Sequence, residues 1–374
     1  MTSFCRFSVL LNKEFFVITD QKDSNMKNFM VLLLTACILS GCIIKTNKVN
    51  EVYAGSTANI EFDGIVDVIK GTNKDIRIVF IHGMGGYSST GGINDYSRVI
   101  NDLRSALKIK SPYIDDSLDS FSYKGQTLTF NVLWWLDITS QAKIKLRDID
   151  DDPVLNPNRT ATTKLAKDRL LNNGIVDVVM YTGSSKKQII QRVRNQVLDL
   201  EEQIDENEKL IVVTFSLGSK ILIDVLNELK ADGDHVLDNR VDMIYMMANQ
   251  IALLNTGDSV NKAPKTLSEK MASDYDTLHS ILDDGTIDAR NANQKKRVIA
   301  FSDPNDLLSY PIDESSVGEL KGQYANVAIS VARKTYKVPV PGVYKYGVVD
   351  YLQAHTGYVH DEVVSDYLLF GTSK

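Results

Sequence analysis

From about residue 60 onward, two patterns of apolar positions follow one another along the chain. Short continuous apolar runs are typical of strands buried on both faces of a parallel sheet, and they alternate with stretches in which apolar residues recur at helical spacing. We predict strands at residues 76–81, 127–135, 174–181, 210–213, 243–248, 297–301 and 326–333, and helices within residues 93–107, 190–204 and 221–229. This alternation indicates an α/β domain with a mainly parallel sheet and right-handed crossovers.

Three segments depart from this pattern. Residues 60–69 alternate loosely and predict an early edge hairpin, while residues 137–173 have a looser apolar pattern and more charge. The acidic run at residues 148–152 lacks the glycine and the distal glutamate of a calcium-binding loop. We therefore predict a solvated loop there and no metal site.

Composition and charge narrow the class of protein. A chain of 374 residues with 43% hydrophobic content can bury a sizeable core. A formal net charge of -6 and the lack of a long basic run argue against a nucleic-acid partner. The three cysteines, Cys5, Cys37 and Cys42, all precede the globular region, so the fold has neither a disulfide framework nor a cysteine-based metal site available to it.

Residues 26–41 have the features of an export signal. A short positive region at residues 26–28 precedes an apolar region at residues 29–34 that is too short to span a bilayer comfortably. The signal ends in the sequence LSGC at residues 39–42, which resembles the lipobox of bacterial lipoproteins. The resemblance implies that the thiol of Cys42 carries a diacylglycerol. Acyl chains contribute about 0.8 kcal/mol per buried methylene, so several chains would hold the protein on a membrane durably.

The other N-terminal boundaries follow from this signal. Residues 1–25 carry charged side chains that do not fit an export signal, so we predict an upstream extension and a true start at Met26. Residues 42–56 are polar without sustained periodicity and are interpreted as a tether to a domain at residues 57–374. Ile43 stands where lipoproteins retained in the inner membrane of enteric bacteria tend to have aspartate. We therefore expect a lipid-anchored protein of the bacterial envelope, at the outer membrane if the source is Gram-negative.

Two short segments are candidates for chemistry. The sequence TFSLG at residues 214–218 joins a buried strand to an amphipathic helix, which requires a sharp corner at Ser216. The sequence HGMGG at residues 82–86 follows the strand at residues 76–81. Without a chemical role, residues 214–218 would be an ordinary junction of a buried strand and a helix, and residues 82–86 would be a glycine-rich turn. A phosphate-binding loop is disfavoured because neither G-x-x-x-x-G-K-[ST] nor G-x-G-x-x-G is present.

Both segments resemble motifs of the α/β hydrolases, namely the nucleophile elbow G-x-S-x-G and the H-G-x-G-G loop after the third strand. The elbow departs from the family pattern at Thr214, which replaces the first glycine. The resemblance covers the chain from about residue 60 and implies an α/β-hydrolase fold with a cap or lid insertion at residues 137–173. It also implies that Ser216 is a nucleophile and that the backbone N–H groups of Met84 and Leu217 form an oxyanion hole. His82 would have a structural, hydrogen-bonding role.

The family order of serine, acid and histidine can be traced further along the chain. Two aspartates, Asp303 and Asp306, follow the strand at residues 297–301, and Asp306 matches the acid loop better because two apolar residues and a nearby proline follow it. Of the histidines near the C-terminus, His355 is favoured over His360 because it precedes a helix-like pattern. His235 and His279 are interpreted as surface residues.

The resemblance implies an esterase or lipase type of serine hydrolase that works through Ser216, Asp306 and His355, without a metal or organic cofactor. Its substrate would be a small-molecule or lipid ester, although amidases, thioesterases and acyltransferases use the same three residues. The alternative is a surface lipoprotein that keeps the fold and only binds an envelope or host partner. Thr214 is the feature that most favours this alternative.

Overall fold

The computed structural model describes residues 43–44, 51–53, 60–85, 96–109, 120–157, 159–205, 208–257, 266–282, 295–331, 335–337, 347–349 and 351–372. The chain divides into two units, Met1–Thr46 with Lys334–Val349 and Asn47–Arg333 with Asp350–Lys374. The described part of the first unit is a three-stranded antiparallel sheet of order β1-β10-β11, made of β1 (Ile43–Ile44), β10 (Thr335–Lys337) and β11 (Gly347–Val349). The predicted export signal and Cys42 lie outside the described residues.

The second unit is built on an eight-stranded sheet of order β2-β9-β8-β7-β6-β3-β5-β4. The strands are β2 (Glu51–Tyr53), β3 (Ile76–Ile81), β4 (Ser120–Tyr123), β5 (Gln126–Leu133), β6 (Lys209–Phe215), β7 (Val241–Met247), β8 (Val298–Ser302) and β9 (Tyr324–Ala328). The six central strands of this sheet, β9, β8, β7, β6, β3 and β5, run parallel to one another. The edge strands β2 and β4 pair antiparallel with β9 and β5, respectively. Thus β1 and β2 both begin and end within the segment predicted as a tether.

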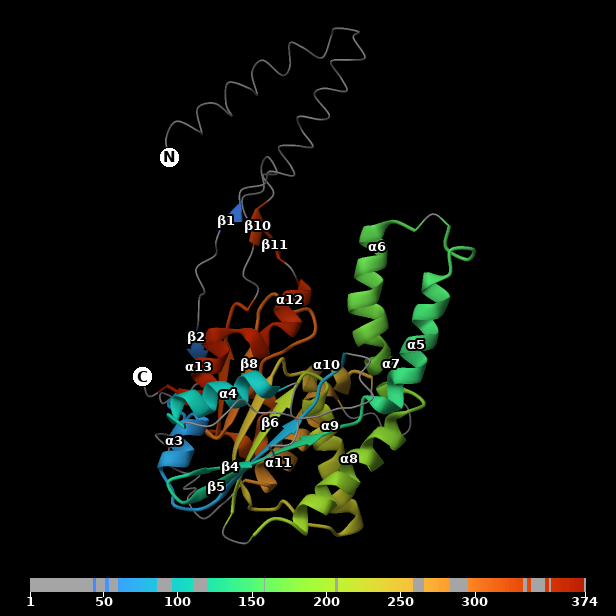
Figure 1. Cartoon of the computed structure of the whole chain (residues 1–374). Helices are drawn as coiled ribbons and strands as arrows, with labels where there is room; N and C mark the ends of the chain where they lie inside the picture. Colours follow the sequence, from blue (N-terminus) through green and yellow to red (C-terminus); the bar gives the residue numbers. More distant parts are fainter. Residues whose placement is uncertain are drawn as a thin grey trace, which may run out of the picture. The chain divides into compact units, whose positions relative to one another are not determined.

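Helices cover both faces of this sheet, and each face has its own hydrophobic core (Figure 1). Along β6, Leu210 and Val212 belong to one core and Ile211 and Val213 to the other, as the alternation of side chains in a strand requires. One core is covered by α8 (Lys186–Glu201), α9 (Gly218–Asp232), α10 (Ile251–Asn255) and α11 (Leu267–Ser280). The other is covered by α3 (Ile65–Lys70), α4 (Ser97–Ala106) and α13 (Glu362–Phe370). The predicted α/β class with a mainly parallel, helix-flanked sheet is confirmed.

A helical segment is inserted between β5 and α8. It consists of α5 (Asp137–Asp151), α6 (Ala161–Ala166), a π-helical stretch (Lys167–Ile175) and α7 (Val176–Thr182). Helix α5 runs along the π-helical stretch and α7 (Figure 1). The segment includes the residues 137–173 that were predicted as a cap. Among the described residues, no helix is both long and apolar enough to cross a membrane.

The strand predicted at residues 174–181 is wrong, because this apolar run is the end of the π-helical stretch and most of α7. Asp177 and Tyr181, four residues apart, face inward, whereas Val179 is 61% exposed. This is the spacing of a helix, and a short apolar run alone does not distinguish it from a strand. The edge hairpin predicted at residues 60–69 is also wrong, since α3 occupies its second half.

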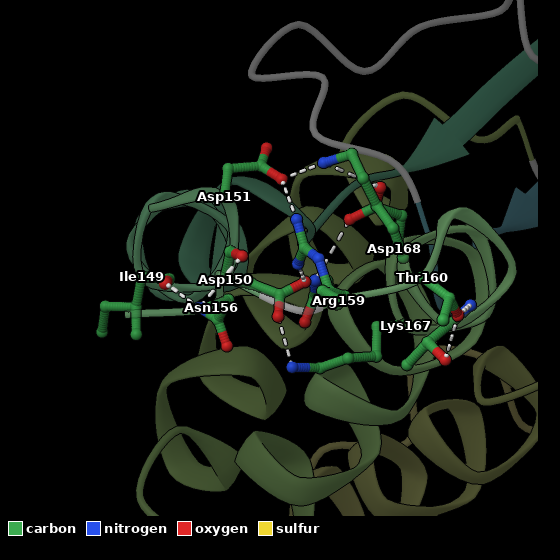
Figure 2. A network of polar contacts seen from close by, with 11 residues as sticks. Ile149, Asp150, Asp151, Asn156, Arg159, Thr160, Lys167 and Asp168 are labelled. Atoms are coloured by element: carbon green, nitrogen blue, oxygen red, sulfur yellow. Dashed lines mark hydrogen bonds and ion pairs between the residues drawn. The ribbon is translucent and has the colours of Figure 1, made fainter. Parts of the chain in front are cut away.

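The acidic run at residues 148–152 forms the end of α5 and the residue after it, so the predicted solvated loop is wrong. Figure 2 shows Arg159 between Asp150 and Asp151, with which it forms ion pairs. Lys167 pairs with Asp150 and Lys164 with Asp151. These cations compensate the carboxylates where α5 meets the following helices.

Candidate active site

Ser216 lies at the corner between β6 and α9 with a backbone φ of 52°. This is the left-handed region, which a residue other than glycine enters at an energetic cost and which recurs at functional sites. The Ser216 N–H donates to the carbonyl of Met247 on the neighbouring strand over 2.8 Å, which helps to hold the corner. The serine therefore has the strained strand-to-helix geometry that the elbow motif predicts.

Glycines make room for this corner at two places. A Cβ atom on Gly218 would lie 2.5 Å from the carbonyl oxygen of Ile81, and one on Gly83 would lie 2.9 Å from Cβ of Ser216. A side chain at either position would clash with its neighbours, so glycine is needed where the glycine loop and the start of α9 approach each other. Thr214, in contrast, is a fully buried residue of β6, and its hydroxyl lies 2.9 Å from that of Ser219.

The structure joins Ser216, His355 and Asp306 in one hydrogen-bonded chain. Oγ of Ser216 lies 2.9 Å from Nε2 of His355, and Nδ1 of His355 lies 2.9 Å from each carboxylate oxygen of Asp306. The three residues are 0%, 5% and 6% exposed, respectively. The carboxylate beside Nδ1 favours the tautomer that carries its proton there, which leaves Nε2 free to accept the proton of the Ser216 hydroxyl.

These side chains come from three separate elements. Asp306 lies in the loop after β8, and His355 lies in the last turn of α12 (Tyr351–Thr356). The sequence analysis expected His355 in a loop before a helix. The predicted helix-like pattern is α13, but His355 lies in a separate short helix, α12, that was not predicted. A 3-10 turn (Tyr358–His360) separates the two helices.

The alternatives that the sequence left open have other partners. The carboxylate of Asp303 accepts hydrogen bonds from the backbone N–H groups of Asn305, over 2.8 Å, and Val331, over 2.7 Å. It therefore orders the turn after β8. His360, the other histidine considered as the base, is exposed at the end of the 3-10 turn before α13. Of the two histidines interpreted as surface residues, His235 is exposed and lies 2.7 Å from Asp238, whereas His279 is partly buried and lies 3.7 Å from Glu319.

Tyr358 is a residue of this site that the sequence analysis did not single out. Its buried hydroxyl accepts a hydrogen bond from the Asp303 N–H over 2.6 Å and donates to Oδ2 of Asp306 over 3.4 Å. Burial, with the charge of Asp306 beside it, raises the pKa of Tyr358 above its usual range, so the hydroxyl keeps its proton. It joins the two halves of the acid loop, and no motif in the sequence marks it.

The glycine loop after β3 is held on both sides of Met84. Nδ1 of His82 lies 2.7 Å from the carbonyl oxygen of Gly83, and the N–H of Gly85 donates to Asp177 over 2.8 Å. Within the described residues, the backbone N–H of Met84 and that of Leu217 have no backbone acceptor. Leu217 directly follows Ser216, and Gly86 of the glycine loop lies outside the described residues.

The two tryptophans of the predicted strand end lie beside this loop. Trp135 is fully buried in the core, and its indole N–H donates to the carbonyl of His82 over 3.0 Å. Trp134 is partly buried, with its ring centroid 4.8 Å from that of His82 in an edge-to-face arrangement. Trp135 therefore supports the loop from the core.

A possible metal-binding group lies in the inserted helices. In the described part of the chain, the carboxylates of Asp150, Asp151 and Asp168 come within 4.8 Å of one another. Their partners are the cations of Arg159, Lys164 and Lys167. Figure 2 shows Arg159 and Lys167 beside Asp150. The acidic group is thus part of an ion-pair network.

Three solved structures match the chain weakly. A protein described as a cell surface hydrolase from Lactobacillus plantarum has 9% sequence identity, covers 72% of this chain and 87% of its own, and has a TM-score of 0.30. A fungal esterase from Rhizomucor miehei has 14% identity with 78% of each chain covered and a TM-score of 0.28. Alpha/beta hydrolase domain-containing protein 10 from mouse has 10% identity, with 75% and 84% covered and a TM-score of 0.24.

No protein-family model and no curated protein sequence matches the chain. With such low identities and TM-scores, the three structures do not inform its substrate or chemistry. The fold class rests on the sheet and on the strand–turn–helix corner at Ser216. The chain has an α/β-hydrolase fold whose elbow serine is hydrogen-bonded to a histidine.

Proposed function

We propose that the protein is a serine hydrolase that cleaves carboxylic esters through an acyl-enzyme. The observation that carries this proposal is the chain from Ser216 through His355 to Asp306, with 2.9 Å between each pair of partners. A serine hydroxyl is unreactive at neutral pH unless a base accepts its proton. His355 is in position to do so, and Asp306 is in position to orient it and to stabilise its charged form.

In the proposed reaction, Oγ of Ser216 attacks the ester carbonyl carbon while its proton passes to Nε2 of His355. The tetrahedral intermediate then expels the alcohol, which takes that proton from His355 as it leaves. A water molecule gives a proton to the same nitrogen and attacks the acyl-enzyme, and the acid leaves as Ser216 recovers its proton. Acylation and deacylation together consume one water molecule and release one alcohol and one carboxylic acid, and neither step needs a cofactor.

The negative charge on the tetrahedral intermediate needs donors that are already in place. We assign this role to the backbone N–H groups of Met84 and Leu217, which have no backbone acceptor in the described part of the chain. Removing one such donor in other hydrolases costs about 10²–10³ in kcat, so the position of this loop has a large influence on rate.

The ester is proposed to be a small molecule or a lipid, at a bacterial membrane to which Cys42 anchors the protein. This rests on the lipobox-like sequence at residues 39–42. Amidases and thioesterases use the same three types of residue, so the leaving group of the substrate has to be identified by experiment.

A fluorophosphonate probe tests the proposal, because it reacts covalently with an activated serine. We expect labelling of the wild type, none of Ser216→Ala, and a rate at least about 10²-fold lower for His355→Ala. Because Ser216 is fully buried, labelling should be measured with and without a non-ionic detergent. A folded wild type that stays unlabelled in both would refute the proposal and favour a binding lipoprotein that keeps the fold.

The choice of acid is tested by two matched substitutions. Asp306→Asn should lower kcat by about 10²-fold or more, since the carboxylate no longer fixes the His355 tautomer. Asp303→Asn keeps an oxygen that can accept the Asn305 N–H, and should mainly lower stability. If Asp303→Asn alone abolished turnover of a p-nitrophenyl ester in folded protein, the assignment would be wrong.

A further inference from the structure

A buried ion pair lies between two inserted helices and the glycine loop. Nζ of Lys143 on α5 is 2.6 Å from Oδ2 of Asp177 on α7, and both side chains are 0% exposed. The second oxygen, Oδ1, accepts a hydrogen bond from the Thr139 hydroxyl over 2.6 Å. The Asp177 carboxylate is therefore fixed from two sides by α5.

The same carboxylate reaches the glycine loop. Oδ2 of Asp177 also accepts the N–H of Gly85 over 2.8 Å. At the end of the π-helical stretch, a Cβ atom on Gly174 would lie 3.4 Å from Cε of Met84, so this stretch packs against the Met84 side chain. The inserted helices thus contact the loop at two consecutive residues, one of which supplies the proposed oxyanion donor.

Stability alone does not explain this pair. Removing two charges from water costs several kcal/mol per ion, and apolar replacements of similar volume are often neutral or stabilising. Burial lowers the pKa of Lys143 and raises the pKa of Asp177, so each charge depends on the other. This buried pair also holds one backbone N–H of the glycine loop, that of Gly85. Its position therefore suits a role in fixing the conformation of that loop.

We propose that Asp177, held by Lys143 and Thr139, is a positioning residue that sets the geometry of the oxyanion hole. This inference rests on the proposed function of Ser216. His82 holds the carbonyl of Gly83 and Asp177 holds the N–H of Gly85, so the peptide groups on both sides of Met84 are fixed. The N–H of Met84 then points in one direction before the substrate arrives, as preorganised stabilisation of an oxyanion requires.

Two double variants separate this hydrogen bond from the ion pair. Lys143→Met with Asp177→Asn removes both charges and keeps an oxygen for the Gly85 N–H. Lys143→Met with Asp177→Leu removes both charges and that acceptor. We expect kcat for a p-nitrophenyl ester within about threefold of wild type in the first and lowered about 10- to 100-fold in the second, because the oxyanion donor is no longer fixed. KM should change little in either.

The rate of fluorophosphonate labelling per folded molecule should follow kcat. Asp137→Asn is a matched control, because Asp137 begins α5 and forms a more exposed pair with Arg192 over 2.9 Å. If a double variant does not fold, Thr139→Val replaces it, since this change keeps the ion pair and frees one carboxylate oxygen. We expect Thr139→Val to lower kcat about two- to fivefold with KM unchanged.

Equal kcat in the two folded double variants, or an unchanged kcat in Thr139→Val, would overturn the inference. A wild type that does not react with the probe at all would instead refute the proposed function. A wild type that reacts, with double variants that react at one common rate, would refute only the role of Asp177.

Discussion

Close backbone packing at Gly218 and Gly83 is what the corner at Ser216 requires. The first residue of the elbow motif is not one of these positions in this chain. Thr214 is a strand residue, where a β-branched side chain fits well, and its buried hydroxyl has a partner in Ser219. We therefore predict that Thr214, although it stands where the elbow motif has glycine, does not loosen the turn at Ser216.

Thr214→Val tests this interpretation. The change keeps the shape of the side chain and leaves the buried Ser219 hydroxyl without its partner, so the free energy of unfolding should fall by roughly 1 kcal/mol. The rate of fluorophosphonate labelling should stay at the wild-type value. Chemical denaturation measures the first quantity, and Thr127→Val, at an exposed position of β5, is the control. A large loss of labelling in folded Thr214→Val would mean that Thr214 does shape the elbow.

Tyr358 leads to a second prediction at the scale of one residue. In Tyr358→Phe the buried N–H of Asp303 loses its acceptor and Asp306 loses a donor, so the free energy of unfolding should fall by about 1–3 kcal/mol. We expect kcat to fall several-fold with KM unchanged, because Asp306 then orients His355 less firmly. Tyr310→Phe, at a 43% exposed tyrosine, is the control. Unchanged stability and kcat would show that the hydroxyl does not order the acid loop.

Ser216, Asp306 and His355, which the structure brings together, could be singled out from the sequence because they occur in the order serine, acid, histidine and the first two come shortly after strands. Asp177, Lys143 and Tyr358 could not be predicted in this way. Their roles depend on contacts between segments far apart in the sequence, and single residues of these types carry no motif.

At the scale of elements, strands buried on both faces were the most predictable feature. The predicted strand at residues 76–81 has the same bounds as β3, which is buried along its whole length. The prediction at residues 174–181 was wrong because α7 packs on α5 through a charged pair. The sequence does not indicate that Asp177 is buried. Without Asp177 on the buried face, the apolar residues of this run do not show a helical period.

Another charged cluster joins four helices. Lys220 of α9 pairs with Asp224 over 2.9 Å and with Asp274 of α11 over 2.8 Å, while Lys186 of α8 and the hydroxyl of Tyr181 of α7 also contact Asp224. Burial alone would raise the pKa of Asp224, but the charges of Lys220 and Lys186 outweigh it and lower that pKa. Asp224 is therefore more acidic in the folded chain than in the unfolded one.

This cluster predicts a loss of stability in acid. A carboxylate whose pKa is lowered by folding contributes stability above the pKa of an unfolded aspartate, about 3.9, and loses it as the pH falls through its folded-state pKa. The free energy of unfolding of the wild type should therefore fall on acidification below about pH 5 more steeply than that of Asp224→Asn. Chemical denaturation from pH 7 to pH 3 measures both. Parallel curves would contradict the prediction.

At the scale of the whole molecule, the chain has two units, and the described part of the second contains all the residues of the proposed reaction. The α/β class was predictable because it follows from the order of apolar patterns. The small sheet of β1, β10 and β11 was not, because strands of two or three residues have no period to detect.

The proposed membrane anchor is tested on the full-length chain in a bacterial host. Metabolic labelling with a palmitate analogue should mark the wild type and fail in Cys42→Ser, which should then leave the membrane fraction. Cys37→Ser, within the predicted signal, is the control. Labelling that persists in Cys42→Ser would place the acyl group elsewhere.

The complete burial of Ser216 has a consequence for how any ester would be measured. A substrate can bind productively only to molecules in which the hydroxyl is accessible, so its apparent dissociation constant equals the intrinsic value divided by the accessible fraction. With about one molecule in a hundred accessible, binding would be weakened about a hundredfold. A substitution that increases this fraction would then lower KM while leaving kcat, which belongs to the bound complex, as it was.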